Sequence, residues 1–215
     1  MPTPRRRAAR WRTPLSPTIV GRMTNATTAG TARHAQAAVA AYYRRLLEGA
    51  HPVLDVGCGK GDFLGAGWVG ADRDLDALRG QTRVTQADVT VGLPFRDSSF
   101  GGFLLKDVVE HLNDPRGLLA EAHRVAKPGA KLVLVTPRAV PRAVWADYTH
   151  MRGFTKDALR SLLADSGWRV SRIARMGAVP LAGRLDFVEA IPILLAIPGV
   201  GHYFGTNWQA LAHRA

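Results

Sequence analysis

Cysteine pairs and long apolar runs are both absent from this sequence. Cys58 is the only cysteine, so no disulfide can form within the chain. The most apolar stretch, at residues 187–201, contains two prolines and is too short to cross a bilayer. No apolar signal segment lies near the start of the chain. We therefore expect a protein without a transmembrane segment and with a cytoplasmic location.

Acidic residues are absent from the first part of the chain, where nine arginines but no Asp or Glu precede Glu48. Of the 29 basic residues, 20 lie in the remainder together with all 17 acidic ones, so this first part accounts for most of the net charge of +12. Residues 1–22 combine arginine with proline and cannot build a core, which predicts a disordered basic tail. Three interpretations of the tail stay open: an over-extended start before Met23, a transit peptide, or an arm that binds nucleic acid or acidic membranes. The nearly balanced remainder predicts no nucleic-acid partner for the folded part.

The length and composition are sufficient for one globular domain. The chain has 215 residues, of which 47% are hydrophobic, enough to bury a full core. We therefore predict a single domain over residues 23–215. Within it, residues 34–48 have the composition of a helix that precedes the first strand.

The most informative segment is VLDVGCGKGDFL at residues 53–64. Its first four residues favour a buried strand, and its glycines favour a turn in which the backbone approaches a ligand closely. The spacing G-x-G-x-G lacks the last glycine of a dinucleotide fingerprint, and Asp62 at that position suits a pyrophosphate badly. Asp55 near the end of the strand instead suits a cationic or hydroxyl-bearing ligand. The turn glycines are Gly57, Gly59 and Gly61.

With this segment the chain resembles the class I S-adenosylmethionine-dependent methyltransferases that act on small molecules, whose first motif has an acid before x-G-x-G-x-G. The resemblance implies that Asp72, at the end of a second strand, accepts hydrogen bonds from both ribose hydroxyls, with Asp74 as the alternative. It also implies that a third strand leads to Asp88 at the adenine amino group. Cys58 is interpreted as a small space-filling residue, because no basic neighbour would lower its pKa. The implied cofactor-binding residues are Asp55, Gly57, Cys58, Gly59, Gly61, Asp72, Arg73, Asp88, Val89 and Lys106.

Residues 100–135 resemble the family most closely. The family patterns "EHL-x-DP" and "R-V-L-K-P-G-G" are recognisable there, although Gly101 stands where an acid is usual and Ala130 where a second glycine is usual. The resemblance implies an α/β fold, a Rossmann-like doubly wound seven-stranded sheet with helices on both faces and the last strand antiparallel. Only eleven residues separate Val56 from Trp68, fewer than a parallel crossover usually takes. We therefore expect a stunted first helix and a more open edge of the pocket.

The acceptor side is predicted from residues 145–155, WADYTHMRGFT. They resemble the "D-P-T-H-x-R-x-F-T" segment of many small-molecule methyltransferases, with Tyr148 where proline is common. Thr155 is the expected cap of a helix over residues 156–166. Because this loop follows the carboxyl end of a strand, where open α/β sheets bind ligands, it should face the transferred methyl group.

Methyl transfer to a hydroxyl needs a group that takes up the proton. His150, His111 and Asp107 are the predicted catalytic residues, with Glu110 as a further candidate, since histidine titrates near neutral pH. In the alternative, structural interpretation, Glu110 and His111 cap or orient the following helix, and His150 ties its loop to that helix. The spacing of these four residues also resembles the metal-binding Glu-x-x-Glu-His plus distant His set of ubiquinone-pathway O-methyltransferases and plant small-RNA 2′-O-methyltransferases, with Asp107 replacing the first Glu. A divalent metal is therefore a further candidate cofactor.

We therefore predict an enzyme that transfers a methyl group from S-adenosylmethionine to a small-molecule acceptor, at oxygen. Residues 187–201 are compatible with a lid over a hydrophobic acceptor, a membrane-surface contact, or a plain insertion packed over the sheet. Two other functions stay open: an S-adenosylmethionine-binding protein without chemistry, and a nicotinamide-dependent reductase, which Asp62 and the short crossover disfavour. The sequence predicts no oligomeric state.

Overall fold

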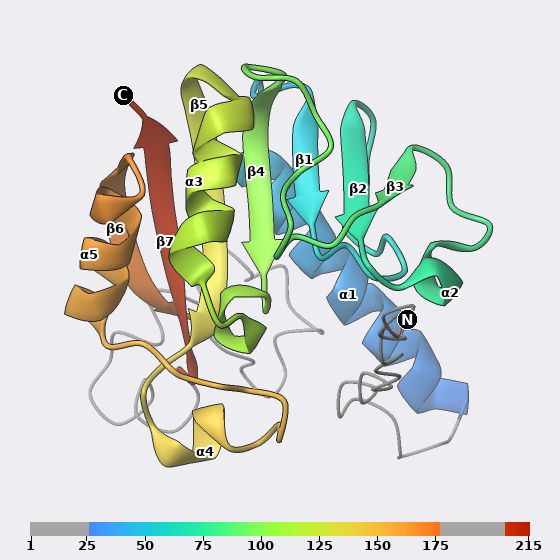
Figure 1. The fold of residues 1–215 in the computed structure, drawn as a ribbon. Coiled ribbons are helices and arrows are strands. Elements are labelled where there is room, and N and C mark those ends of the chain that lie inside the picture. Colours follow the sequence, from blue (N-terminus) through green and yellow to red (C-terminus); the bar gives the residue numbers. More distant parts are fainter. Residues whose placement is uncertain (1–25, 177–204) are drawn as a thin grey trace, which may run out of the picture.

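The computed structural model describes residues 26–176 and 205–215, which form one sheet flanked by helices (Figure 1). The strands are β1 (Val53–Val56), β2 (Trp68–Asp72), β3 (Val84–Gln86), β4 (Phe100–Lys106), β5 (Ala126–Pro137), β6 (Trp168–Met176) and β7 (Asn207–Arg214). The helical elements are α1 (Ala26–Leu46), α2 (Leu75–Leu78), the 3-10 segment η1 (Val109–His111), α3 (Pro115–Val125), α4 (Pro141–Val144) and α5 (Lys156–Asp165).

The seven strands lie in the order β3-β2-β1-β4-β5-β7-β6. The pairs β2–β3, β1–β2, β1–β4 and β4–β5 are parallel, whereas β7 runs antiparallel to both β5 and β6. The predicted seven-stranded sheet with an antiparallel last strand is confirmed. The carboxyl ends of β1, β2 and β4 point to the lower edge of the sheet in Figure 1, where η1 and α4 also lie. Open α/β sheets bind ligands at this edge.

Each face of the sheet carries its own apolar cluster, because successive side chains of a strand point to opposite faces. On one face Val53, Leu104 and Val133 pack with Tyr43 of α1 and with Leu47, the residue that follows α1. The other face is covered by α3 and α5, which lie in front of the sheet in Figure 1. The apolar side chains from the three central strands on that face are Leu54, Val56, Phe103, Leu105, Leu132 and Leu134. The prediction of helices on both faces is therefore confirmed, and alternation puts Asp55 on the face of α1.

Side-chain caps fix where the two longer helices after β4 begin. Asp114 accepts a hydrogen bond from Gly117 N at 2.9 Å, and Pro115 opens α3 at a position where its missing N–H is not needed. Thr155 accepts a hydrogen bond from Ala158 N at 3.1 Å and caps α5, as the sequence predicts. These caps position the segments on either side of η1 and of the loop that leads into α5.

The first crossover contains no helix, so the predicted stunted helix is wrong. Residues 57–67 run from β1 to β2 through turns alone. Five of these eleven residues are glycine, and each glycine in a helix interior costs roughly 1 kcal/mol relative to alanine. The crossover is instead held to α1, where Arg44 Nη2 donates to Leu64 O at 2.7 Å and the ring of Phe63 lies edge-on to that of Tyr43.

Two predicted features lie outside the described residues: the basic tail at residues 1–22 and the apolar stretch at residues 187–201. Among the residues described, no helix combines the length and the apolar composition needed to span a bilayer. The single domain over residues 23–215 and the cytoplasmic location stay predictions.

Candidate active site at the carboxyl ends of the strands

The glycine turn is built onto the end of β2 by backbone hydrogen bonds. Gly57 N and Cys58 N both donate to Ala71 O, at 2.7 and 3.1 Å. Gly57 has a φ of 73°, and a Cβ at this position would come within 2.6 Å of Val108 Cγ2. Only glycine fits this position, because the backbone is left-handed and Val108 leaves no room for a side chain. The contact also joins the turn to the segment after β4, which leads to the acceptor side.

Asp72 holds the turn and the start of α2 at the same time. Its Oδ2 accepts a hydrogen bond from Gly59 N at 2.8 Å, and its Oδ1 accepts one from Asp74 N at 2.8 Å. A carboxylate has about four lone-pair positions, so Asp72 keeps the capacity to accept further hydrogen bonds. Asp74 is already engaged, because its side chain caps α2 through the backbone N–H groups of Asp76 and Ala77. Asp72 contacts the glycine turn through Gly59 N, whereas the hydrogen bonds that the Asp74 side chain accepts come from α2, so Asp72 is the acid next to the turn, and its role at the ribose stays a prediction.

Asp55 is a buried carboxyl with an unused oxygen. Its residue is 2% exposed, and among the described residues no group donates a hydrogen bond to Oδ2. Burial raises the pKa of Asp55 to about 8, and the negative charge of Asp72 contributes to the rise while Lys106 opposes it. A buried polar atom without a partner is costly, so Oδ2 is suited to a ligand that brings a cationic donor.

Lys106 and Asp107 form an ion pair where β4 ends. Lys106 Nζ also lies 5.9 Å from the centre of the Phe63 ring, which belongs to the first crossover. Asp107 adopts a φ of 55°, an uncommon left-handed conformation that aspartate tolerates better than most residues. Lys106, a predicted cofactor-binding residue, therefore lies at the end of β4 and contacts both the first crossover and Asp107.

The other predicted cofactor residues lie around this edge. Burial raises the pKa of the Cys58 thiol to about 12, which agrees with its interpretation as a packing residue and not a nucleophile. Asp88 accepts hydrogen bonds from Thr90 N and Oγ1, at 2.9 and 2.7 Å, and these lower its pKa. Val89 packs against the core, and the backbone carbonyl of Arg73 accepts a hydrogen bond from Gln86.

Glu110 is a fully buried acid on the side of the site where the acceptor is predicted to bind. The residue is 0% exposed, and its Oε2 accepts a hydrogen bond from Thr136 Oγ1 at 3.0 Å. Its Oε1 is buried and receives no hydrogen bond from the described part of the chain. Burial raises the pKa of Glu110 to about 8, helped by the negative charge of Asp107. The backbone of the same residue holds the next loop, because Met151 N donates to Glu110 O at 2.9 Å.

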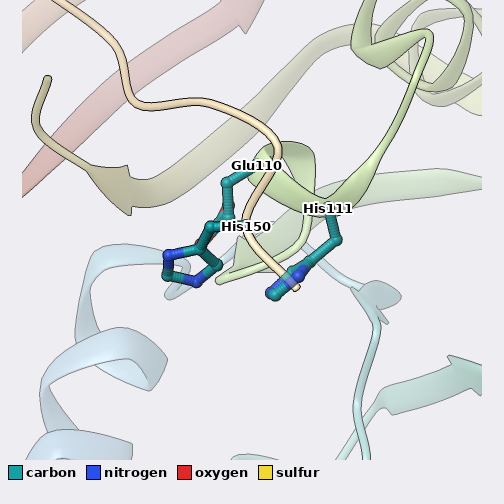
Figure 2. Close-up of side chains that lie close together, drawn as sticks. All are labelled: Glu110, His111 and His150. Carbon is teal, nitrogen blue, oxygen red and sulfur yellow. The ribbon is translucent and has the colours of Figure 1, made fainter. Parts of the chain in front are cut away.

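His111 and His150 lie side by side next to Glu110 (Figure 2), with ring centres 4.7 Å apart. His150 Nδ1 lies 2.7 Å from Val144 O, and because a carbonyl can only accept, Nδ1 carries the hydrogen. His111 Nδ1 lies 3.1 Å from Thr149 Oγ1, whose own hydrogen is donated to Asp147 at 2.7 Å. His111 Nδ1 is therefore a donor as well. In its neutral form, each imidazole keeps the lone pair of Nε2.

The structure brings together only part of the predicted catalytic set. One ligand atom from each of Glu110, His111 and His150 lies within 4.8 Å of those of the other two, but Asp107 is not part of this group. The predicted structural contacts also differ in detail. The helix after η1 is capped by Asp114, not by Glu110 or His111, and it is His111, not His150, that bonds to the neighbouring loop. Sequence reasoning assigned no role to Thr136 or Thr149: Thr136 belongs to no recognised motif, and Thr149 lies in the segment that resembles "D-P-T-H-x-R-x-F-T", where the histidine alone was taken as functional.

Large apolar side chains are exposed on the loop that carries His150. Trp145 is 66% exposed, Tyr148 76% and Met151 48%. Exposed apolar groups that gather around polar functional groups are typical of binding sites. The loop therefore offers apolar surface within a few residues of the histidine pair.

Comparison with known protein families gives a match over most of the described chain. The model of a methyltransferase domain family matches residues 31–173. The chain belongs to this methyltransferase family. Both the sheet edge with the glycine turn and the Glu110–His111–His150 group lie within the matched part of the methyltransferase domain.

Known relatives agree with this assignment. The methyltransferase domain is 33% identical over 161 residues to an uncharacterised protein of Mycobacterium tuberculosis, covering 66% of this chain and 55% of that protein. It is 36% identical over 124 residues to a demethylmenaquinone methyltransferase of Renibacterium salmoninarum, covering 51% of this chain and 52% of that one. The chain thus spans about half the length of the curated relatives it matches. Among solved structures, an S-adenosylmethionine-dependent methyltransferase from Archaeoglobus fulgidus has the same fold, with a TM-score of 0.64 at 20% identity over 88% of this chain and 100% of that one.

The residues of the methyltransferase domain fit S-adenosylmethionine, the cofactor that the family implies. The unused Oδ2 of Asp55 offers an acceptor to an ammonium group, and Asp72 has acceptor capacity left for hydroxyl groups. The glycine turn lets a ligand approach the backbone closely. A pyrophosphate would meet the carboxylates of Asp55, Asp62 and Asp72, so the same residues fit a nicotinamide dinucleotide poorly.

Proposed function

We propose that this methyltransferase domain transfers a methyl group from S-adenosylmethionine to an oxygen atom of a small-molecule acceptor. The observation that carries the proposal is the pair of Nε2 lone pairs on His111 and His150, next to the strand ends that hold the predicted cofactor residues. An oxygen acceptor needs a group that takes up its proton, whereas a thiolate or a free amine does not. The histidine pair supports oxygen for this reason.

The chemistry assigns a separate task to each side of the site. When bound, S-adenosylmethionine supplies a methyl carbon to which the acceptor oxygen bonds as the carbon–sulfur bond breaks and leaves its electron pair on sulfur. Asp55, Asp72 and the glycine turn hold the cofactor at the carboxyl ends of β1 and β2. A histidine Nε2 receives the hydroxyl proton, and the carbonyl of Val144 stabilises the resulting imidazolium at Nδ1 of His150.

A partly apolar acceptor is the second part of the proposal. Trp145, Tyr148 and Met151 expose apolar surface on the loop that carries His150, and such surface binds apolar groups. The Renibacterium relative is named as a methyltransferase that acts on demethylmenaquinone, a small molecule. Hydroxylated aromatic molecules therefore form the first acceptor class to test.

Two measurements test the proposal in sequence. Calorimetric titration of the full chain with S-adenosylhomocysteine should give binding that Asp72→Ala abolishes, and titration with NADH should give none. Binding of NADH instead would support a reductase, which the family match already disfavours. Release of S-adenosylhomocysteine is then measured with phenols, amines and thiols. Turnover confined to amines or thiols would refute an oxygen acceptor.

A histidine variant separates an enzyme from a binding protein without chemistry. His150→Gln should retain S-adenosylhomocysteine affinity and lose most of the turnover with phenols, because it removes a proton acceptor from the acceptor side only. His213→Gln is the matched control, since His213 lies on β7 and bonds to Ser171, away from the cluster. If both variants retained turnover equally, the histidine pair would have no part in the reaction.

A further inference from the structure

Glu110, His111 and His150 have the donor set of a metal centre. Their ligand atoms lie within 4.8 Å of one another in the described part of the chain, and the three side chains converge from η1 and the loop before α5 (Figure 2). Two imidazoles and one carboxylate are ligands that bind divalent transition metals such as zinc, cobalt and iron. The histidines alone would also suit proton transfer, so the carboxylate and its surroundings decide between the two uses.

Glu110 supports a cation at this position because one of its carboxylate oxygens has no hydrogen-bond partner among the described residues. The residue is fully buried, Thr136 satisfies Oε2, and Oε1 receives no hydrogen bond from any described residue. A buried carboxylate oxygen without a donor is destabilising, because its lost hydration is not replaced. A cation next to Oε1 would remove that cost, as metal coordination commonly does for buried acids.

Both histidines are oriented as metal ligands usually are. Metal-binding histidines almost always donate their second ring N–H to a carbonyl or carboxylate, which fixes the tautomer and the ring orientation. His150 Nδ1 donates to Val144 O at 2.7 Å, and His111 Nδ1 bonds to Thr149, which in turn bonds to Asp147. Both Nε2 lone pairs are therefore available from rings that are already held in place.

We propose that Glu110, His111 and His150 bind one divalent transition-metal ion, of the zinc or cobalt type, through Glu110 Oε1 and the two imidazoles. Zinc–nitrogen bonds of about 2.0–2.1 Å place tetrahedral ligands about 3.4 Å apart, so side-chain shifts of about 1 Å close the site around the ion. Three protein ligands leave at least one position open for an oxygen of the acceptor.

The role of the ion rests on the proposed oxygen methylation, but its binding does not. A hydroxyl oxygen at the open position loses its proton more readily, because the ion stabilises the oxyanion. With an ion bound, both histidines would serve as ligands and the hydroxyl proton would pass to solvent water; without an ion, a histidine Nε2 takes up the proton as in the proposed function. If the ion takes part in the reaction, the acceptor is a molecule whose hydroxyl group can coordinate a metal ion.

Binding of the metal alone tests the inference. The full chain, free of any histidine tag and treated with chelator, is titrated with Co²⁺ by visible absorption and with Zn²⁺ by calorimetry. We expect one equivalent to bind, with the absorption of a low-symmetry site, and affinities lower by about tenfold or more in Glu110→Gln and His150→Gln. His213→Gln is the control and should bind as the wild type does. Circular dichroism checks that each variant is folded; glutamine keeps the shape of Glu110 and an acceptor for Thr136.

The outcomes separate the metal site from methyl transfer. Absence of stoichiometric binding, or binding that neither variant weakens, would overturn the metal site, and turnover that persists in chelator would assign the proton to a histidine. Metal binding without binding of S-adenosylhomocysteine would instead leave the metal site standing and refute the proposed function.

Discussion

Binding of S-adenosylhomocysteine should tighten as the pH rises from about 6 to about 7.5, because Asp55 must lose a proton to receive the ammonium group of the ligand. In the free protein, burial and the charge of Asp72 raise the pKa of Asp55 to about 8, so the carboxyl is mostly protonated at neutral pH. A cationic donor at Oδ2 favours the ionised form. Ligand binding therefore releases a proton, and affinity rises with pH up to about 8, where Asp55 is already ionised.

The size of the effect follows from the pKa. Each pH unit below the pKa of about 8 adds about 1.4 kcal/mol to the free energy needed to ionise Asp55. The dissociation constant should therefore fall about tenfold between pH 6 and pH 7, and nearly one proton should be released per ligand at pH 7. Calorimetry in two buffers that differ in ionisation enthalpy measures the proton release directly.

Two variants assign the released proton to its source. Asp55→Asn keeps a polar side chain that cannot ionise, so its affinity should be weaker and should not change with pH. Glu110→Gln is the control, because Glu110 also has a pKa raised to about 8 but lies on the acceptor side. It should retain the full pH dependence. The reasoning is refuted if Asp55→Asn keeps the wild-type slope, or if the wild type shows none.

Two further predictions concern the scaffold of the site, and both are measured by urea denaturation. Gly57→Ala should destabilise the fold by about 1–3 kcal/mol more than Gly49→Ala and should weaken cofactor binding, because both glycines have φ near 75° but only Gly57 faces a side chain, that of Val108. Equal losses would mean that Val108 moves aside freely. Arg124→Lys should cost about 2 kcal/mol, since lysine cannot reproduce the fork by which Arg124 donates to Glu121 and to two backbone carbonyls before β4. Arg160→Lys, in an exposed pair with Asp157, is the control and should change stability by less than about 0.5 kcal/mol.

The first strand could be predicted from its own residues because strand and turn preferences are local. The apolar side chains of Val53, Leu54 and Val56 predicted a buried strand where β1 lies, and the glycine turn after Val56 lies where the sequence predicts it. The helix predicted for the first crossover does not form, because five of residues 57–67 are glycine, which disfavours a helix. The glycine content of residues 57–67 thus outweighed the tendency of parallel crossovers to contain a helix.

Of the four residues whose spacing resembles a metal-binding set, Asp107 does not join the group, and the backbone geometry explains why. Asp107-x-x-Glu110 brings two acids together only if the residues between them follow a regular turn. Asp107 instead has a φ of 55° and lies before η1, where its carboxylate pairs with Lys106. No local pattern in the sequence signals this left-handed residue. Glu110 and the two histidines consequently form a group without it.

The sequence by itself determined the glycine turn and the acids near the ends of β1 and β2, because strand and turn preferences act within a few residues, and its resemblance to the family implied the succession of the strands. Tertiary structure alone decided which distant groups meet. His111 bonds to Thr149, 38 residues away, and Glu110 meets His150 only because β4 and β5 are neighbours and the loop after β5 returns to η1. Burial under α1 likewise raises the pKa of Asp55, since desolvation depends on everything packed around a carboxyl and not on its neighbours in sequence.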